Sequence, residues 1–525
     1  MKISISNSRF TLLAVFFSLF FLQCHPAKKT TKTTDDGQIE IVILHLNDVY
    51  EIAPLGSDGK GGLAQVAALR KQLQAQNPNV LTVLAGDFLS PSVTGVLKYD
   101  GKRIRGKQMV ATLNALGLDC VVFGNHEFDY DLADLQSRLD ESNFTWLAAN
   151  ARLITTEGTT PFYKNKNGVK ENCPDNITYT FTDADGTQLK LGLFGVLINT
   201  GKKDWVQYSD WTEAALKQYA DLKPRTDVVL GLTHLAIEED KKLAGIMQSV
   251  PLIMGGHDHD NMFHTVGATK IAKADANART VYVHKLKWDK NKGKVEVRSE
   301  LRTIDATIGE EPATAAVVAY WENIKNESLV SAGFDPTLKV ATLTAPLDCR
   351  DAFTRNNPAP VGNLVTSAMM AAAKYNPDCA VWNSGSLRID DVLTGTVYAI
   401  DVVRMLPFGG GLTEVEMTGS LLQRTLDTGK SNLGSGGYLQ LKNIVFNSKE
   451  QRWMINGIMM DQNKTYKVIL PEFLLTGGEQ NMGFLKCTSE KAAEGIQKVH
   501  AADPADASDL RSDIRKALIS YWKQQ

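Results

Sequence analysis

The sequence lacks the features that mark nucleic-acid-binding proteins, thiolate zinc proteins and polytopic membrane proteins. Its net charge is −2, from 57 basic and 59 acidic residues, so no basic field exists to attract a nucleic-acid polymer. Its six cysteines include no C-x-x-C pair, which argues against a cysteine zinc site. We expect the cysteines that follow Cys24 to be isolated buried thiols. After the N-terminal apolar run, the sequence contains no apolar run long enough to span a membrane.

The N-terminus has the pattern of an export signal. Two basic residues precede the apolar run Phe10–Leu22, which suits a signal-peptide core and is short for a membrane span. Cys24 follows this run, as the acceptor cysteine does in a bacterial lipoprotein, although Phe21 and Gln23 depart from the usual Leu and small residue. We therefore expect an exported protein, periplasmic or on the outer membrane or cell surface, with a lipid anchor at Cys24. Cleavage nearby without a lipid is the alternative.

A chain of 525 residues predicts more than one domain. Strands alternate with helical stretches up to about residue 305, which predicts a layered sheet with helices on its faces. Leu63–Gln76 carries apolar residues on one helical face, and Pro312–Ser328 predicts a further helix after the last of these strands. The expected divisions are a signal segment (1–24), a flexible tether (25–38), a first α/β domain (39–305), a linker helix (306–337) and a second α/β domain (338–525).

Five apolar segments of the first domain each end in Asp, Asn or His. Short apolar runs bounded by Gly or Asn predict buried strands, and ligands of layered α/β folds bind beyond the carboxyl ends of the strands. Mixed carboxylate, amide and imidazole ligands suit Mn, Fe, Co, Zn or Ni, so the five segments together predict one metal centre. The segments are Ile41–Asp48, Val80–Asp87, Cys120–His126, Val228–His234 and Val250–His259.

Two divalent ions about 3.5–4 Å apart need a bridging carboxylate and terminal ligands on each side. Asp87 stands alone after its strand and ahead of a loop, which fits the bridge. We expect Asn125, His234 and His257 to complete the coordination of one ion, and Asp48 and His259 to bind the other.

His126 directly follows one of these ligands. At strand-like spacing its side chain points away from the metal, so we expect it to act on the substrate. Asp129, three residues later, can orient the His126 imidazole.

The order and setting of G-N-H-E-F-D and G-G-H-D-H resemble the 5′-nucleotidase family, and the resemblance extends from residue 39 to the C-terminus. It implies a four-layer α/β/β/α metallophosphoesterase domain followed by a smaller α/β substrate-binding domain. It also implies hydrolysis of nucleoside 5′-monophosphates at a centre of two divalent ions (Mn, Zn, Co or Fe). The family's metal ligands map onto the six residues named above, and its catalytic pair maps onto His126 and Asp129.

Tyr50 departs from this family pattern, in which the first motif is N-D-x-H and its His binds metal. A phenol with a pKa near 10 is a poor ligand for Mn²⁺ or Mg²⁺ unless the ion removes its proton. Three outcomes follow. In the first, water fills the vacant position and the first metal ion is bound more weakly. In the second, Tyr50 binds a harder ion such as Fe³⁺ as phenolate. In the third, the protein has no activity. We favour them in that order.

The second domain carries side chains suited to a small anionic ligand with an aromatic ring. Arg pairs with phosphate, Asn reads ring nitrogens or hydroxyls, and Phe offers a flat face for a base. The resemblance assigns Phe473 to one of two rings around the base and aligns Leu412 with the other. It aligns Glu479 with the Asp that holds the ribose. The substrate-binding candidates are Arg355, Asn383, Arg388, Leu412, Phe473 and Glu479.

The expected function is therefore an exported, metal-dependent phosphohydrolase acting on a small nucleotide, with no obligate protein partner. The alternatives within the enzyme class are a 2′,3′-cyclic nucleotide phosphodiesterase, a nucleotide-sugar hydrolase and the family's thiosulfohydrolase branch. The alternative of another class is a catalytically silent, nucleotide-binding surface lipoprotein, which the substitution at Tyr50 keeps open.

Overall fold

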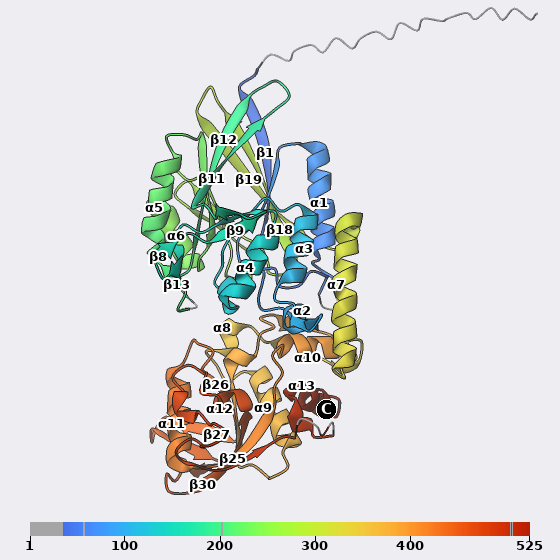
Figure 1. Cartoon of the computed structure of the whole chain (residues 1–525), viewed down its shortest axis with the longest axis vertical. Helices are drawn as coiled ribbons and strands as arrows, with labels where there is room; N and C mark the ends of the chain where they lie inside the picture. The colour runs from blue at the N-terminus through green and yellow to red at the C-terminus, as the bar shows by residue number, and fades with distance from the viewer. Residues whose placement is uncertain (1–34, 56–57, 201–202, 504–505, 507) are drawn as a thin grey trace, which may run out of the picture.

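The computed structural model describes residues 35–55, 58–200, 203–503, 506 and 508–525 (Figure 1). The predicted signal segment 1–24, its lipid-acceptor cysteine and most of the expected tether lie outside the described residues. Within these ranges no helix combines the length and apolar character needed to cross a membrane. The first part of the chain forms the upper domain of Figure 1 and the last third forms the lower one.

Two six-stranded sheets form the centre of the upper domain. In the first, the strand order is β19-β18-β1-β2-β5-β6, and β1, β2, β5 and β6 run parallel. In the second, the order is β11-β12-β14-β15-β17-β16, with β12, β14, β15 and β17 parallel. The first sheet comprises β1 (Gln38–Leu46), β2 (Val80–Leu84), β5 (Cys120–Val122), β6 (Thr145–Leu147), β18 (Thr280–Asp289) and β19 (Lys294–Thr303). The second comprises β11 (Asn176–Thr182), β12 (Gln188–Leu197), β14 (Val228–His234), β15 (Leu252–Gly255), β16 (Met262–Val266) and β17 (Thr269–Lys273).

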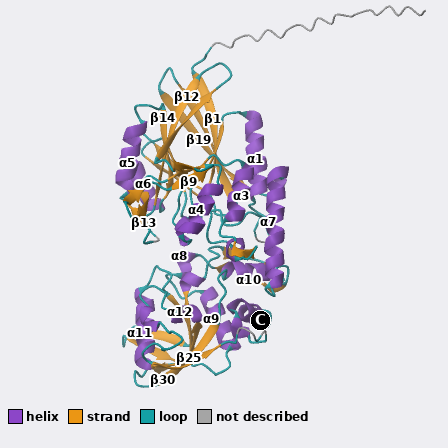
Figure 2. Cartoon of the chain, viewed as in Figure 1, coloured by secondary structure: helices purple, strands orange, loops and turns teal. Residues whose placement is uncertain are grey.

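The two sheets face each other and helices cover their outer faces, as Figure 2 shows. In β1, Ile41 and Ile43 face the second sheet, whereas Val42 and Leu44 face the helices. A strand buried on both faces needs a continuous apolar run, which explains the sequence of β1. The first sheet is covered by α1 (Leu63–Gln76), α3 (Lys107–Leu116) and α4 (Leu132–Glu141), and α7 (Pro312–Ser331) packs on α1 and α3. The second sheet is covered by α5 (Trp211–Leu222) and α6 (Ile237–Ile246). The predicted four-layer α/β/β/α arrangement is confirmed.

The five predicted strands are all present, and helix α1 has the predicted bounds. Four strands end before their predicted segments do: β1 ends at Leu46, β2 at Leu84, β5 at Val122 and β15 at Gly255. The polar residues that follow them therefore lie in turns beyond the sheet edge. The cysteines after Cys24 are free, as expected, and all but Cys487 are buried.

A five-stranded sheet with the order β26-β22-β30-β25-β31 forms the lower domain. Helices α9 (Pro360–Ala372) and α13 (Ile514–Trp522) pack on one face, and α11 (Gly419–Ser431) packs on the other. This is the smaller α/β domain that the sequence predicted. Its strands are β22 (Cys379–Asn383), β25 (Leu412–Thr418), β26 (Leu439–Lys442), β30 (Thr465–Pro471) and β31 (Ile496–Ala501).

Helix α7, yellow in Figure 1, runs from the upper domain to the lower one. Near its end Leu329 packs with Val93 of the upper domain and with Val403 of the lower domain. The predicted helix at this place is confirmed and extends to Ser331.

Short elements complete the described chain. In the upper domain they are α2 (Val93–Val96), β3 (Lys98–Tyr99), β4 (Lys102–Arg103), β7 (Ala151–Thr155), β8 (Gly158–Thr160), β9 (Tyr163–Lys166), β10 (Val169–Asn172), β13 (Val206–Tyr208) and the 3₁₀ turns η1 (His126–Asp129) and η2 (Ala306–Ile308). In the lower domain they are β20 (Lys339–Thr342), β21 (Leu347–Asp348), α8 (Asp351–Thr354), η3 (Ser384–Ser386), β23 (Val392–Leu393), β24 (Thr396–Tyr398), α10 (Ala399–Met405), β27 (Ile444–Asn447), β28 (Arg452–Ile455), β29 (Ile458–Met459), α12 (Glu472–Leu475), η4 (Gly483–Leu485) and η5 (Leu510–Ser512).

Candidate active site

The predicted ligand residues come together at the edge where five parallel strands of the upper domain end. Asp48, Asp87 and His257 all have left-handed backbone conformations, with φ of 51°, 53° and 79°. Residues other than glycine rarely adopt this conformation, and such strain persists where the surrounding structure enforces it, often at functional sites. In the motifs G-N-H and G-G-H, a Cβ at Gly124 would collide with the Asp87 carboxylate, and one at Gly256 with Ala85 O. Glycine is therefore required for the strand ends to approach.

Asp87, His234 and His257 form a cluster whose candidate ligand atoms all lie within 4.8 Å of one another. His234 Nε2 lies 3.0 Å from Asp87 Oδ2 and 3.2 Å from Asn125 Oδ1. Its other ring nitrogen, Nδ1, is 2.7 Å from the carbonyl oxygen of Ala85, so Nδ1 carries a proton and donates it there. In neutral His234 the remaining nitrogen is then a lone pair aimed at a carboxylate.

Two facing lone pairs require a positive charge between them. Burial by itself lowers the pKa of His234, but the Asp87 carboxylate outweighs it and raises the pKa to about 9. A proton or a metal ion can supply the charge, and carboxylate, amide and imidazole are all suitable metal ligands. The residues present therefore fit a divalent ion at this position.

Asp48, His259 and Tyr50 form a second group of donors beside the first. His259 Nε2 lies 3.4 Å from Asp48 Oδ1, and the phenol oxygen of Tyr50 lies 2.9 Å from that nitrogen and 3.4 Å from that oxygen. Ligands about 2.0–2.1 Å from a metal lie roughly 3.0–3.4 Å from one another at octahedral to tetrahedral angles. The spacing of these three atoms is thus that of ligands around one ion. Tyr50 is buried and lies in the site.

His126 and Asp129 face each other as expected, with His126 Nδ1 2.8 Å from Asp129 Oδ2. Ser90 Oγ donates to the same carboxylate oxygen over 2.9 Å. Burial opposes the charged imidazole, but the Asp129 and Asp87 carboxylates raise the pKa of His126 above its usual value. The expectation of strand-like spacing was wrong, because these residues form the 3₁₀ turn η1 (His126–Asp129).

Glu127, which was not among the predicted site residues, braces that turn. Its buried carboxylate accepts hydrogen bonds from the backbone N–H groups of Asp87, Phe88 and Gly124 over 2.7–2.9 Å. Burial, reinforced by the Asp87 carboxylate, raises the pKa of Glu127 to about 7. Glu127 thereby ties the turn after β5 to the turn after β2. Its place between His126 and an apolar residue in G-N-H-E-F-D was the available signal.

Lys273 was also missed, and it holds the loops that bear His234, His257 and His259. Its fully buried ammonium donates to Leu235 O (2.6 Å), Gly256 O (2.8 Å) and Asp258 Oδ2 (2.6 Å). It also lies 2.9 Å from the buried Asp240 carboxylate. Burial alone lowers the pKa of Lys273, but the two carboxylates outweigh burial and raise it. A lysine at the end of β17 gives no local sequence signal of this role.

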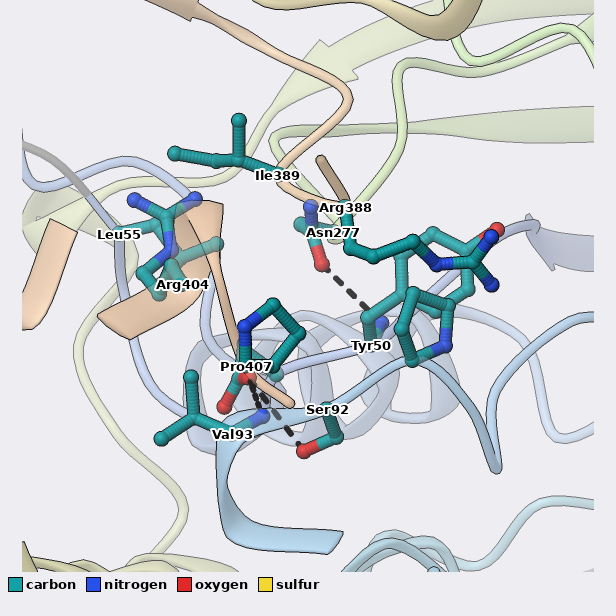
Figure 3. Close-up of a pocket in the computed structure, with 11 residues that line it drawn as sticks. Tyr50, Leu55, Ser92, Val93, Asn277, Arg388, Ile389, Arg404 and Pro407 are labelled. Carbon is teal, nitrogen blue, oxygen red and sulfur yellow. Dashed lines mark hydrogen bonds between the residues drawn. The ribbon is translucent and has the colours of Figure 1, made fainter. Parts of the chain in front are cut away.

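Of the two predicted arginines of the lower domain, Arg388 contacts this site. Arg388 Nη2 lies 3.3 Å from Asp129 Oδ2, and Arg388 lines the same pocket as Tyr50 (Figure 3). Arg355 pairs with Asp351. The Nε atoms of Arg355 and Arg388 are buried and have no hydrogen-bond acceptor among the described residues. Each is a free donor suited to an anion.

The nucleoside candidates divide into those that are available and one that is not. Asn383 Nδ2 donates to Glu479 Oε2 over 2.7 Å, and the Phe473 ring is 42% exposed. Leu412 begins β25 and is fully buried in the core of the lower domain, so it presents no exposed face to a base in this structure. Phe408, four residues earlier, is 57% exposed, and its ring centroid lies 5.9 Å from Arg388 Cζ. An apolar residue before Gly-Gly in a loop was the missed signal.

Comparison with known families agrees with both halves of this description. Residues 41–261 match the calcineurin-like phosphoesterase family, and residues 339–486 match the 5′-nucleotidase C-terminal domain. The chain belongs to the 5′-nucleotidase family. The first match contains every predicted metal ligand, and the second contains all six predicted nucleotide-binding residues. A calcineurin-like phosphoesterase fold implies divalent metal ions, and the Asp87–His234–His257 cluster is the candidate place for one.

Relatives along nearly the whole chain support this membership of the 5′-nucleotidase family. The chain is 25% identical to the 5′-nucleotidase of Bos taurus, over 92% of this chain and 89% of that protein. It is 24% identical to the 5′-nucleotidase of Vibrio vulnificus, over 87% of this chain and 88% of that protein. The crystal structure of a 5′-nucleotidase precursor from Thermus thermophilus superposes with a TM-score of 0.66 at 20% identity, covering 93% of this chain and 96% of that one. This likeness shows the shared fold.

Proposed function

We propose that this member of the 5′-nucleotidase family hydrolyses nucleoside 5′-monophosphates to nucleoside and phosphate with the help of two divalent metal ions. The observation that carries the proposal is the meeting of two half-sites. The carboxylate and imidazole cluster of the upper domain lies against Arg388 of the lower domain, whose Nε is buried and free to donate. Substrate sites commonly form at domain interfaces, and a phosphate monoester fits between metal ligands and guanidinium donors.

In this proposal Asp87 would be a ligand shared by both metal sites. Asn125, His234 and His257 would complete one site, and Asp48 and His259 would hold the other. The donor set suits Mn, Zn, Co or Fe. When bound, the ions would supply Lewis-acid charge that polarises a phosphate ester and activates water.

The protein groups nearest the phosphate then stabilise developing charge. Asp129 holds the Nδ1 proton of His126, so the other ring nitrogen is free to face the substrate, and that nitrogen lies 4.0 Å from Asp87 Oδ2. The raised pKa of His126 favours a protonated imidazole, which can donate to a phosphate oxygen. Arg388 adds a second positive charge on the same side.

The nucleoside would bind against the lower domain. Phe473 and Phe408 are both exposed, and the strand ends beside them are paired through Leu412 and Pro471. The Asn383–Glu479 pair offers an amide and a carboxylate for hydroxyls or ring nitrogens. Two flat faces bind any base, so we expect broad base tolerance.

The decisive experiment is phosphate release by protein that lacks residues 1–24, after chelation and separate reloading with Mn²⁺, Co²⁺, Zn²⁺, Mg²⁺ or iron. The substrates would be AMP, UMP, UDP-glucose, 2′,3′-cyclic AMP and bis-p-nitrophenyl phosphate. Metal-dependent release from AMP and UMP is expected. If the protein hydrolyses the cyclic diester or the nucleotide sugar faster, that compound would replace the nucleoside monophosphate as the proposed substrate. Silence across the panel with metal still bound would favour a nucleotide-binding protein.

We propose in addition that the protein is exported and anchored by a lipid at Cys24. The support is the apolar run Phe10–Leu22 with the cysteine behind it. Labelling the expressed full chain with a radioactive fatty acid, beside the Cys24→Ala variant, tests this. Label in the membrane fraction of the wild type and none in the variant is expected, and equal labelling of both contradicts the anchor.

A further inference from the structure

One contact joins a candidate metal ligand of the upper domain to the lower domain. His259 faces the proposed first metal site through Nε2, while its Nδ1 contacts the Asp390 carboxylate of the lower domain. Asp390 lies in the loop between η3 and β23, two residues after Arg388. The imidazole is therefore held from behind by a residue that comes from the other domain.

We infer that Asp390 is a positioning residue that orients His259 toward the first metal ion, so that the first metal site is complete only with the lower domain in place. The inference rests on the proposed function for the role of the metal. A proton on Nδ1 that is donated to Asp390 leaves the Nε2 lone pair directed at the site. Carboxylates that accept this second ring proton fix the tautomer and orientation of metal-bound histidines and raise their basicity.

The local structure of Asp390 supports this role. Its backbone is left-handed, with φ of 42°, a conformation that is uncommon for residues other than glycine. Its second carboxylate oxygen accepts a hydrogen bond from the backbone N–H of Asp351 over 2.5 Å, and Asp351 in turn pairs with Arg355. Both oxygens are thus engaged, one by its own domain and one by His259, which fixes the direction of the carboxylate.

Two further ion pairs join the same surfaces. Arg388 reaches Asp129 beside the catalytic histidine, and Arg350 Nη1 lies 3.2 Å from Asp260 Oδ2, directly after His259. The lower domain therefore contacts both sides of the metal centre. Among these contacts, that of Asp390 is the one made to a candidate ligand.

Asp391 offers a matched control at the next position. One oxygen of its carboxylate accepts a hydrogen bond from the backbone N–H of Val392, and the other lies 3.9 Å from Arg404. Its substitution removes the same charge from the same loop without touching His259 in the described contacts. A difference between the two positions therefore reports the contact to the imidazole and not the loss of a nearby negative charge.

The test is cobalt binding by the metal-free two-domain protein, followed by visible absorption and by counting bound metal after dialysis. Asp390→Ala should lower the affinity for one of two Co²⁺ ions by about 10–100-fold, the usual effect of losing the hydrogen-bond partner of a metal-bound histidine. Asp390→Asn, which keeps an acceptor, should lose less, and Asp391→Ala should bind as the wild type. Wild-type affinity for both ions in Asp390→Ala would overturn the inference.

Combining Asp390→Ala with His259→Ala separates positioning from general stability. If Asp390 acts through His259, the double variant should bind Co²⁺ no more weakly than His259→Ala alone. Additive losses would mean that Asp390 acts elsewhere. Should Asp390→Ala not fold, Asp390→Asn decides the question by the same titration, and unchanged affinity there contradicts the inference. Because metal binding is measured without substrate, a failure of the proposed hydrolysis remains distinguishable.

Discussion

The phenol oxygen of Tyr50 lies 2.9 Å from Nε2 of His259, and both atoms are about equally far from Asp48 Oδ1, at 3.4 Å. Tyr50 therefore lies among the candidate ligands of the proposed first metal site. Burial, and next the Asp87 and Asp48 carboxylates, raises the pKa of Tyr50 well above its usual value. A bound phenol in this position either shares the site with water or loses its proton to a strongly polarising ion.

Substitution of Tyr50 distinguishes these two states. Tyr50→His supplies the imidazole of the family pattern, so we expect at least about 10-fold tighter Co²⁺ or Mn²⁺ at the first site and slower loss to a chelator. Tyr50→Phe removes only the hydroxyl. If water is the ligand, its metal content stays at the wild-type level. If the phenol oxygen is the ligand, one ion is lost.

Metal analysis after dialysis, with absorption spectra of iron-loaded protein, measures both variants. A phenolate bound to ferric iron gives a visible charge-transfer band that Tyr50→Phe must abolish. Identical metal content and chelator sensitivity in all three proteins would contradict the placement of Tyr50 at the site.

Loss of His126 should separate catalysis from metal binding. In His126→Ala the six candidate ligands remain, so metal content should be unchanged, while kcat for AMP should fall by about 10²–10⁴-fold with the loss of a positioned proton donor. Asp129→Asn should give a smaller loss, because Asp129 orients the imidazole and does not itself meet the phosphate. His264→Ala, a histidine of β16 outside the ligand loops, is the control. Wild-type turnover in His126→Ala would exclude His126 as the catalytic residue.

Lys273 should matter for both folding and metal retention. Lys273→Met leaves the Asp240 and Asp258 carboxylates without their cation, and breaking a buried ion pair costs about 3–5 kcal/mol. The loop with His257 and His259 also loses its anchor, so bound metal should fall. Chemical denaturation and metal analysis measure the two effects. Lys325→Met is the matched control, because Lys325 is a buried lysine paired with Glu322 in α7. It should lower stability without lowering metal content.

The strands, the layered fold and the candidate ligand residues could be predicted from the sequence, because each depends on a short stretch of neighbouring residues. An apolar run that ends in Asp, Asn or His predicts both a strand and a candidate metal ligand at its end, as in Val228–His234. The roles of Glu127 and Lys273 could not be predicted, since most of their partners lie 15 or more residues away, up to 40, and six of their contacts are to backbone atoms. The meeting of His259 with Asp390 depends on how the two domains dock, which no local pattern encodes.

Glu311 links helix α7 to the acid stability of the protein. As the residue that caps the helix N-terminus, it accepts from the backbone N–H and the hydroxyl of Thr314, both over 2.8 Å, and this lowers its pKa to about 2. Because the folded-state pKa is depressed, the stabilisation is present above the unfolded value of about 4.3 and is lost as the pH falls toward 2.

Glu311→Ala should therefore destabilise the metal-free protein at pH 7 by about 0.5–2 kcal/mol, the usual value of a helix cap, and by less at pH 3. Thermal unfolding of wild type and variant at the two pH values gives the comparison. Glu327→Ala, which removes an exposed acid from the same helix, is the control. An equal difference in stability between wild type and Glu311→Ala at pH 7 and pH 3 would mean that the carboxylate charge of Glu311 does not contribute to stability.

Phe408 and Leu412 provide opposite tests of the nucleoside site, because one ring is exposed and the other side chain is in the core. Phe408→Ala should raise KM for AMP by about 5–100-fold, since stacking on a base is worth about 1–3 kcal/mol, and should leave stability near that of the wild type. Leu412→Ala should lower stability by about 2–5 kcal/mol through the cavity it creates, with KM unchanged in the folded fraction. Kinetics and denaturation of both variants decide between them. A KM effect confined to Leu412→Ala would restore Leu412 as the residue that faces the base and remove Phe408 from the site.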